Sequence, residues 1–155
     1  MKKLFLFFLL ALSVMQGRAQ LLVDADYNAA GDKIEVTFKN MSDSLTLIFC
    51  GERMPYPDAQ MEYVEMEDGS TFNYPLCMSS ILPGNLFFLH PGEKWLYVTP
   101  LPKGSRVRAF SLVAGYWRAN MPKEEWGKDI EYKMKNWRKH TLPGRSSVEF
   151  LRTIK

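Results

Sequence analysis

Few side chains of this 155-residue chain could do chemistry, and the two cysteines, Cys50 and Cys77, are the most reactive of them. They form no CxxC motif and have no neighbouring base, so the pattern does not indicate redox or nucleophilic catalysis. A Cys50–Cys77 disulfide would close a loop of about 27 residues and stabilise the fold by roughly 3.5 kcal/mol. Two separately buried thiols are the alternative, and mass spectrometry under non-reducing conditions distinguishes the two.

The histidines and carboxylates also lack the spacing of a catalytic or metal site. His90 and His140 belong to no HxH, HxxxH or HExxH motif, and these spacings are the ones that bring histidines to one zinc ion. Asp24 and Asp26 alternate along an early segment as ordinary surface acids do. The chain also contains no GxSxG, P-loop or GxGxxG motif. We therefore expect a protein that is not an enzyme and that needs no metal or other cofactor.

Large aromatic side chains gather with basic ones near residue 120, and they form the strongest candidate binding site. The proposed binding residues are Tyr116, Trp117, Arg118 and Trp126, with Lys123 and Lys128 as basic neighbours. Loops between strands commonly carry recognition, and Trp, Tyr and Arg are typical interface anchors. Flat aromatic rings also suit sugar rings. The alternative is a small apolar core that closes one end of the domain.

The elements that must position these residues are short strands. In the stretch from Lys33 to Phe49, apolar residues alternate with polar ones on both sides of a polar break at residues 40–44. This period of two predicts two strands joined by a loop, and we expect an antiparallel hairpin. A hairpin is marginally stable alone, so its apolar face must be covered by further strands or a helix.

Turn signals recur every 8 to 15 residues along the rest of the chain and separate about eight to ten short strands. The sequence predicts an all-β fold, an antiparallel immunoglobulin-like β-sandwich with one short helical insertion. The insertion is expected at residues 120–127, because Pro122 and acidic residues precede Gly127 there. Alternation from Ile130 to Met134 predicts a half-exposed strand, and residues 142–145 are expected to form a turn before the closing strand.

The first 19 residues have the three parts of a secretory signal peptide. Two lysines precede an apolar run from Leu4 to Met15, and Gly17 and Ala19 mark a cleavage site after Ala19. The run is shorter than the roughly 20 residues of a transmembrane helix, and no cysteine follows it for lipid attachment. We expect a periplasmic or secreted protein that is not a lipoprotein, with residues 20–155 as one β-sandwich domain and no transmembrane segment after cleavage. An uncleaved anchor is the alternative.

The balance of charge argues against nucleic acid as a partner. The formal charge of +3 comes from the leader, and the mature chain has 17 basic and 17 acidic residues. Residues 20–89 carry 11 acids and 3 bases, whereas residues 90–155 carry 6 acids and 14 bases. These opposite charges either pair across neighbouring strands or create a basic face that meets an acidic partner.

Several short motifs resemble those of a known family. The matching residues are Asn40, Ser42, Asp43, Leu47, Phe49 and Gly51, followed by Pro91, Gly92 and Glu93. Together they resemble the bacterial intracellular proteinase inhibitor family, which implies an immunoglobulin-like sandwich and proteinase inhibition. The chain differs from that pattern in its leader, its greater length and the Pro-rich segment after Gly51. It is also similar to small exported domains of Gram-negative bacteria.

These observations predict a non-enzymatic binding module of the bacterial cell envelope. We expect its partner to be another envelope or secreted protein. A carbohydrate-binding module and a proteinase inhibitor are the alternatives, the first because of the aromatic residues and the second because of the family resemblance.

Overall fold

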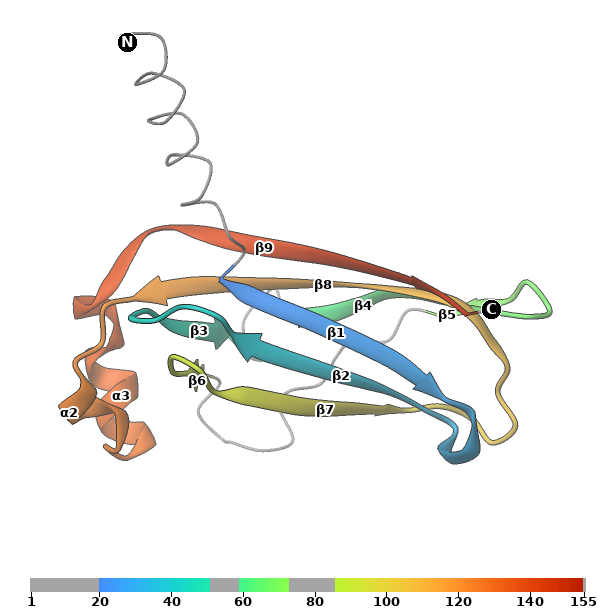
Figure 1. The fold of residues 1–155 in the computed structure, drawn as a ribbon, viewed down its shortest axis with the longest axis horizontal. Coiled ribbons are helices and arrows are strands. Elements are labelled where there is room, and N and C mark those ends of the chain that lie inside the picture. The colour runs from blue at the N-terminus through green and yellow to red at the C-terminus, as the bar shows by residue number, and fades with distance from the viewer. Residues whose placement is uncertain (1–19, 51–58, 73–85, 155) are drawn as a thin grey trace, which may run out of the picture.

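Two antiparallel sheets pack face to face in the computed structural model, which describes residues 20–50, 59–72 and 86–154 (Figure 1). The three-stranded sheet has the order β1 (Leu21–Asn28), β2 (Lys33–Asn40) and β7 (Lys94–Pro100). The larger sheet contains β5 (Thr71–Phe72), β4 (Ala59–Met66), β8 (Val107–Ala119), β3 (Thr46–Cys50), β6 (Leu86–Leu89) and β9 (Thr141–Thr153). The prediction of an all-β, two-layer domain is therefore confirmed.

In residues 20–50, 59–72 and 86–154, helical structure is confined to short segments. A turn of 3-10 helix, η1 (Ala29–Gly31), joins β1 to β2, and α2 (Lys123–Trp126), α3 (Ile130–Asn136) and η3 (Trp137–Lys139) follow one another between β8 and β9. Among the described residues, no helix has the length and apolar character needed to cross a membrane.

The core lies between the sheets because alternate side chains of each strand point to it. Ile34, Val36 and Phe38 of β2 are fully buried and meet large side chains of the other sheet, among them Phe49 and Phe110. The rings of Phe38 and Phe49 lie 6.0 Å apart. Fully burying such a side chain stabilises the fold by about 1.5–3 kcal/mol, so this layer of aromatic and branched side chains holds the two sheets together.

The predicted hairpin of residues 33–49 is wrong, although both of its strands exist. In the structure β2 pairs with β1 and β7, whereas β3 pairs with β6 and β8. The intervening loop therefore carries the chain from one sheet to the other (Figure 1). A hairpin and such an arch have the same alternating pattern, because in both cases the apolar side chains of the two strands point to one core.

Asn40 fixes this change of sheet. Its buried side chain donates from Nδ2 to the carbonyls of Leu45 (2.7 Å) and Leu89 (2.8 Å), and its Oδ1 accepts from the backbone N–H of Ser42 (2.9 Å). Its backbone N–H donates to the carbonyl of Glu93 at 3.0 Å. One residue thus joins the β2–β3 arch to the neighbouring β6–β7 arch, which also changes sheets.

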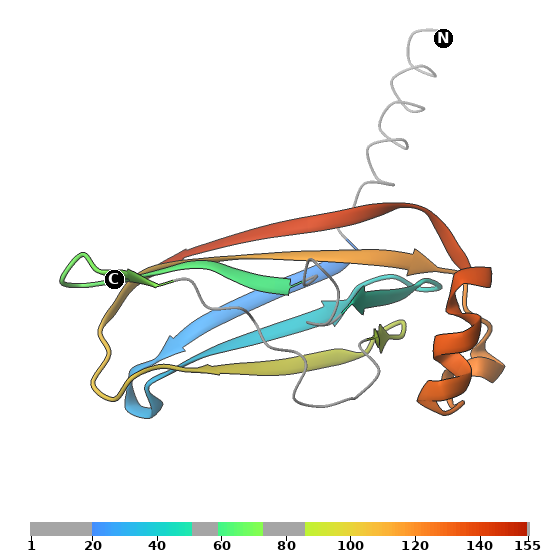
Figure 2. The ribbon, with the colours of Figure 1, turned by 180° about the vertical axis from the view of Figure 1, so that it is seen from behind.

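The two longest strands, β8 and β9, form the frame of the larger sheet. They pair from Ala109–Thr153 to Ala119–Thr141, and the opposite edge of β8 pairs with β4 along its first part and with β3 near its end. The ribbon of β8 and β9 therefore runs along the whole sandwich in both views (Figures 1 and 2).

Two predictions for the C-terminal third are wrong. Ile130 to Met134 is part of the helix α3, because Asp129 caps its start by accepting the N–H of Tyr132 at 2.8 Å. Glu131 and Lys135, one turn apart, form an ion pair of 2.7 Å. Residues 142–145 continue β9, with Gly144 at φ +84° beside a shift in pairing register. Glycine accepts this left-handed conformation within a bulge.

Candidate functional site

The segment Lys123–Lys139, comprising α2, α3 and η3, is called the helical cap here. It lies at one end of the sandwich, beside the arch between β2 and β3, and the C-terminus lies at the other end (Figures 1 and 2). Both ends of the segment are held by the β8–β9 ribbon, because the N–H of Asn120 donates to the carbonyl of His140 at 2.9 Å.

Tyr116 and Trp117 point to opposite faces of β8, as expected for neighbouring residues of a strand. Tyr116 is 4% exposed and lies in the core with its ring 5.9 Å from that of Phe49. Burial raises the pKa of its phenol above the usual range. Trp117 is half-buried on the outer face, where its ring lies 6.5 Å from that of Trp137 in η3. Tyr116 therefore holds the two sheets together and Trp117 holds the cap, so the two residues do not form one exposed surface.

Arg118 lies at the bulge of β9. Its Nη2 donates to the carbonyl of Pro143 at 3.3 Å, whereas its buried Nε has no hydrogen-bond partner among the described residues. The side chain is half-buried. Arg118 thus supports the point where the ribbon enters the cap.

Trp126 closes α2 against the sandwich. Its ring stacks on the imidazole of His90 with centroids 4.9 Å apart and planes 12° from parallel. Its Nε1 donates to the carbonyl of Met121 at 3.0 Å, and the ammonium of Lys123 lies 5.9 Å from its ring centroid. The ring of Trp126 thus contacts both His90 and Lys123. The four residues that the sequence assigned to one site are divided between the core, the β8–β9 ribbon and the cap.

His90, which the sequence gives no special motif, is the point where the cap meets the sandwich. The residue is 4% exposed. Its Nδ1 lies 3.0 Å from Oγ1 of the buried Thr46, and its Nε2 lies 3.3 Å from Nζ of Lys133 in α3. Burial, and then the charge of Lys133, lower the pKa of His90, and Glu93 together with the backbone carbonyl of Trp126 offsets only part of this effect.

A tight turn holds His90 in this position. Glu93 donates its N–H to the carbonyl of His90 at 3.0 Å, and the Glu93 carboxylate accepts the N–H of His90 at 2.7 Å. Gly92 has φ +78°, as a type II turn with Pro91 at its second position requires. This turn at residues 90–93 aims the imidazole of His90 at the cap.

The second histidine also touches the cap. Nε2 of His140 lies 3.2 Å from Oε2 of Glu125 in α2, an ion-pair distance without hydrogen-bond geometry. Both side chains are about four-fifths buried, at 21% and 18% exposed. The two histidines of the chain therefore contact the two α-helices of the cap, His140 through a carboxylate and His90 through an ammonium group and an indole ring.

The cap carries exposed apolar side chains as well as basic ones. Tyr132 and Met134 of α3 are each 37% exposed. The ammonium of Lys128 lies 5.9 Å from the ring centroid of Tyr132, and the guanidinium of Arg138 lies 5.5 Å from that of Trp137. Tyr132 and Met134 were not predicted as surface candidates, because the alternating pattern placed them on a strand. The capping Asp129 and the Glu131–Lys135 spacing were the signals for a helix.

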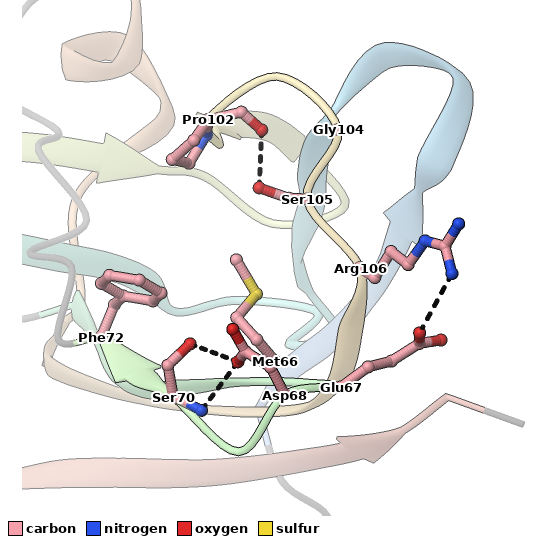
Figure 3. A pocket seen from close by; sticks show the side chains of 9 residues that line it. All are labelled: Met66, Glu67, Asp68, Ser70, Phe72, Pro102, Gly104, Ser105 and Arg106. Atoms are coloured by element: carbon pink, nitrogen blue, oxygen red, sulfur yellow. Dashed lines mark hydrogen bonds and ion pairs between the residues drawn. The ribbon is translucent and has the colours of Figure 1, made fainter.

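A hollow of about 370 Å³ lies at the opposite end of the sandwich (Figure 3). Its wall combines the loop after β7 with the turn between β4 and β5, and the lining residues include Met66, Phe72 and Ser105. Asp68 accepts hydrogen bonds from both the N–H and the hydroxyl of Ser70, so its carboxylate stabilises its own turn. The hollow is open to solvent and mixes apolar with polar walls.

Several acids of the first half pair with bases of the second half. The pairs are Glu65–Arg108 at 3.3 Å, Glu67–Arg106 at 3.7 Å and Asp26–Arg152 at 3.5 Å. Because these side chains are mostly exposed, each pair contributes little to stability, about 0–1 kcal/mol. Their arrangement nevertheless agrees with the interpretation that opposite charges of the two halves lie beside each other.

The remaining candidates lie partly outside the described residues. Cys77 falls in one of the gaps and the side chain of Cys50 is not described, so the disulfide stays a prediction. No group of three or more His, Cys, Asp or Glu side chains with a metal-binding arrangement occurs in residues 20–50, 59–72 and 86–154.

Comparisons of the chain with protein-family models, with characterised proteins and with solved structures gave no significant match.

Proposed function

We propose that this protein is an exported, non-enzymatic binding module of the bacterial cell envelope that engages another protein through its helical cap. The scaffold in this proposal is an immunoglobulin-like sandwich, formed by residues 20–155 after the leader is removed behind Ala19. The leader, the absence of catalytic motifs in the sequence and the two-sheet architecture support it.

The single observation that carries the proposal is that the anchored helix α3 exposes two large apolar side chains, Tyr132 and Met134, on either side of Lys133. Tyrosine and methionine are enriched at protein interfaces. A helix of seven residues has little stability of its own, and here it is held by contacts of Lys133 and Trp126 with His90. Binding residues on an immobilised element lose less conformational entropy on association. In this proposal Trp117, Arg118 and Trp126 position the surface, and Tyr116 supports it from the core.

The test compares variants of the exposed cap residues with variants of apolar residues elsewhere that are still more exposed. Tyr132→Ala combined with Met134→Ser removes the proposed contact, while Leu96→Ser and Leu151→Ser change side chains that are 65% and 64% exposed on β7 and β9. The mature chain is cross-linked in envelope extracts, and captured proteins are identified by mass spectrometry. We expect the cap variant alone to lose a specific partner at unchanged thermal stability. Equal capture by all variants contradicts the proposal.

Carbohydrate binding is the second candidate, and the hollow at the opposite end favours it. Phe72 lines this hollow together with Ser70 and Arg106, and an apolar ring beside polar groups is a suitable surface for a sugar. A glycan array with wild type and Phe72→Ala tests this candidate. Glycan binding that Phe72→Ala abolishes would support it, whereas an array without binding would contradict it.

Proteinase inhibition is a narrower form of protein engagement. Residual-activity assays against serine, cysteine and metalloproteinases test it directly, with the Tyr132→Ala and Met134→Ser variant as the comparison. Inhibition that the cap variant retains would place the contact on another surface.

A further inference from the structure

We propose that the helical cap is fastened to the sandwich by an acid-sensitive latch in which neutral His90 accepts a hydrogen bond from Lys133. Protonation of His90 releases α3 while the two sheets stay folded. This attachment of the cap does not depend on whether the cap binds a partner. It rests on the contacts of one buried side chain with three elements, β3, α2 and α3.

The geometry assigns the protonation state of His90. The ammonium group of Lys133, 3.3 Å from Nε2, has only hydrogens to offer, so Nε2 must accept. Nδ1 then carries the imidazole hydrogen and donates to Oγ1 of Thr46 at 3.0 Å. In this arrangement both ring nitrogens have a partner when the ring is neutral. The ring is 4% exposed, so water cannot easily replace either partner.

Protonation of Nε2 places two positive charges 3.3 Å apart in a buried site. Burial also lowers the pKa of Lys133, and the charge of Glu93 offsets part of that effect. The ammonium group is the part that can leave, because it ends a flexible side chain on a half-exposed position of α3. Its departure also ends its contact over the ring of Phe88, 5.7 Å from the centroid. Those two contacts tie the middle of α3 to the sandwich.

Other groups around His90 favour its protonated form, and so weaken the effect of protonation on the docking of α3 without abolishing that effect. The Glu93 carboxylate and the backbone carbonyl of Trp126 favour a charged ring, and the indole of Trp126 can stack on an imidazolium. Thr46 is neutral. Burial and Lys133 outweigh these groups, so the net effect is a lowered pKa of His90. We therefore expect α3 to loosen, with Trp126 retained longer than Lys133.

Because the pKa of His90 is lowered in the docked state, docking of the cap should weaken as the pH falls. With the cap released, His90 titrates near its usual pKa of 6.5, and with the cap docked it titrates lower. The released state therefore binds more protons between these two values, and docking weakens as the pH falls from 6.5 towards the docked pKa. For one proton, the docking constant falls by at most about tenfold at a pH one unit below 6.5. The contact between His140 and Glu125, at 3.2 Å, does not involve His90.

Amide hydrogen exchange of the mature chain measures docking element by element. Protection factors, which correct for the intrinsic effect of pH, are compared near pH 7.5 and near pH 5.5 for α3 and for the core strand β8. A parallel NMR titration follows the His90 ring. We expect α3 to lose protection by up to about tenfold at the lower pH while β8 keeps its protection, and His90 to titrate below 6.5.

Three variants identify the groups responsible. Lys133→Gln keeps a hydrogen-bond donor without the charge and should reduce the acid response of α3. His90→Gln should abolish it, and His140→Gln should leave it in place. An acid response that is as large in Lys133→Gln as in wild type, or that disappears in His140→Gln, overturns the latch. So does wild-type His90 titrating at or above 6.5, a measurement that needs no variant to fold.

Discussion

Replacing Asn40 by alanine tests whether one side chain holds the two arches together. The residue is 1% exposed and makes three side-chain hydrogen bonds, of 2.7, 2.8 and 2.9 Å, to the backbones of Leu45, Leu89 and Ser42. Alanine keeps the backbone contacts of Asn40 with the neighbouring arch and removes all three of these bonds. It also leaves the buried carbonyl of Leu89 without this donor.

The expected loss follows from the number of bonds. A buried hydrogen bond contributes about 0.5–1.5 kcal/mol, and a buried acceptor left without its partner costs more. Three bonds therefore give a loss of about 3 kcal/mol in the free energy of unfolding. For a domain of this size the midpoint of thermal unfolding should fall by roughly 10 °C. Such a loss is a large fraction of the total stability of an ordinary domain.

Urea unfolding followed by tryptophan fluorescence and circular dichroism provides the measurement. Ser42→Ala is the matched control, because its hydroxyl accepts from the N–H groups of Ser44 and Leu45 in the same loop but is half-exposed. We expect that control to lose less than about 1 kcal/mol. A loss below 1 kcal/mol in Asn40→Ala, or equal losses in both variants, would refute the reasoning.

Three further predictions concern turn, core and surface. Gly92→Ala should destabilise the domain by about 1–2 kcal/mol in urea unfolding, because φ is +78° there; unchanged stability would contradict the turn assignment. Phe110→Ala should cost about 3–5 kcal/mol because the ring is fully buried, whereas Leu96→Ala should stay within about 0.5 kcal/mol; similar values for the two would contradict the core assignment. Asp26→Asn removes the exposed ion pair with Arg152 and should change stability by less than about 1 kcal/mol, and less still in high salt.

The strands could be predicted from the sequence because their side chains alternate about a single core. Leu47 and Phe49 are buried while Ile48 packs on the outer face with Trp117 and Trp137, as a period of two requires. What the alternation could not provide is the partner of each strand. The residues of β2 and β3 would alternate identically in a hairpin. The hydrogen bonds of Asn40 and the pairing of the two strands with different neighbours stabilise the arch.

The site could be predicted only in part, and the reason lies in α3. Ile130, Tyr132 and Met134 alternate with charged residues, so the period indicated a strand, while the capping Asp129 indicated a helix. In a segment of seven residues, the capping hydrogen bond of Asp129 and the Glu131–Lys135 ion pair outweigh the alternation of apolar and charged residues. The contact of His90 with Lys133 joins residues 43 positions apart, and no local pattern predicts a contact of that kind.

The closure of the β8–β9 ribbon at Ala119 and Thr141 has a consequence for how the chain can vary. Because both ends of the intervening segment are fixed opposite each other, everything between them is a hairpin loop that needs no further sheet contact to keep its stem aligned. A loop closed this way tolerates changes in length at a small entropic penalty. The segment between Ala119 and Thr141 is therefore the natural place to graft a different recognition element onto this scaffold.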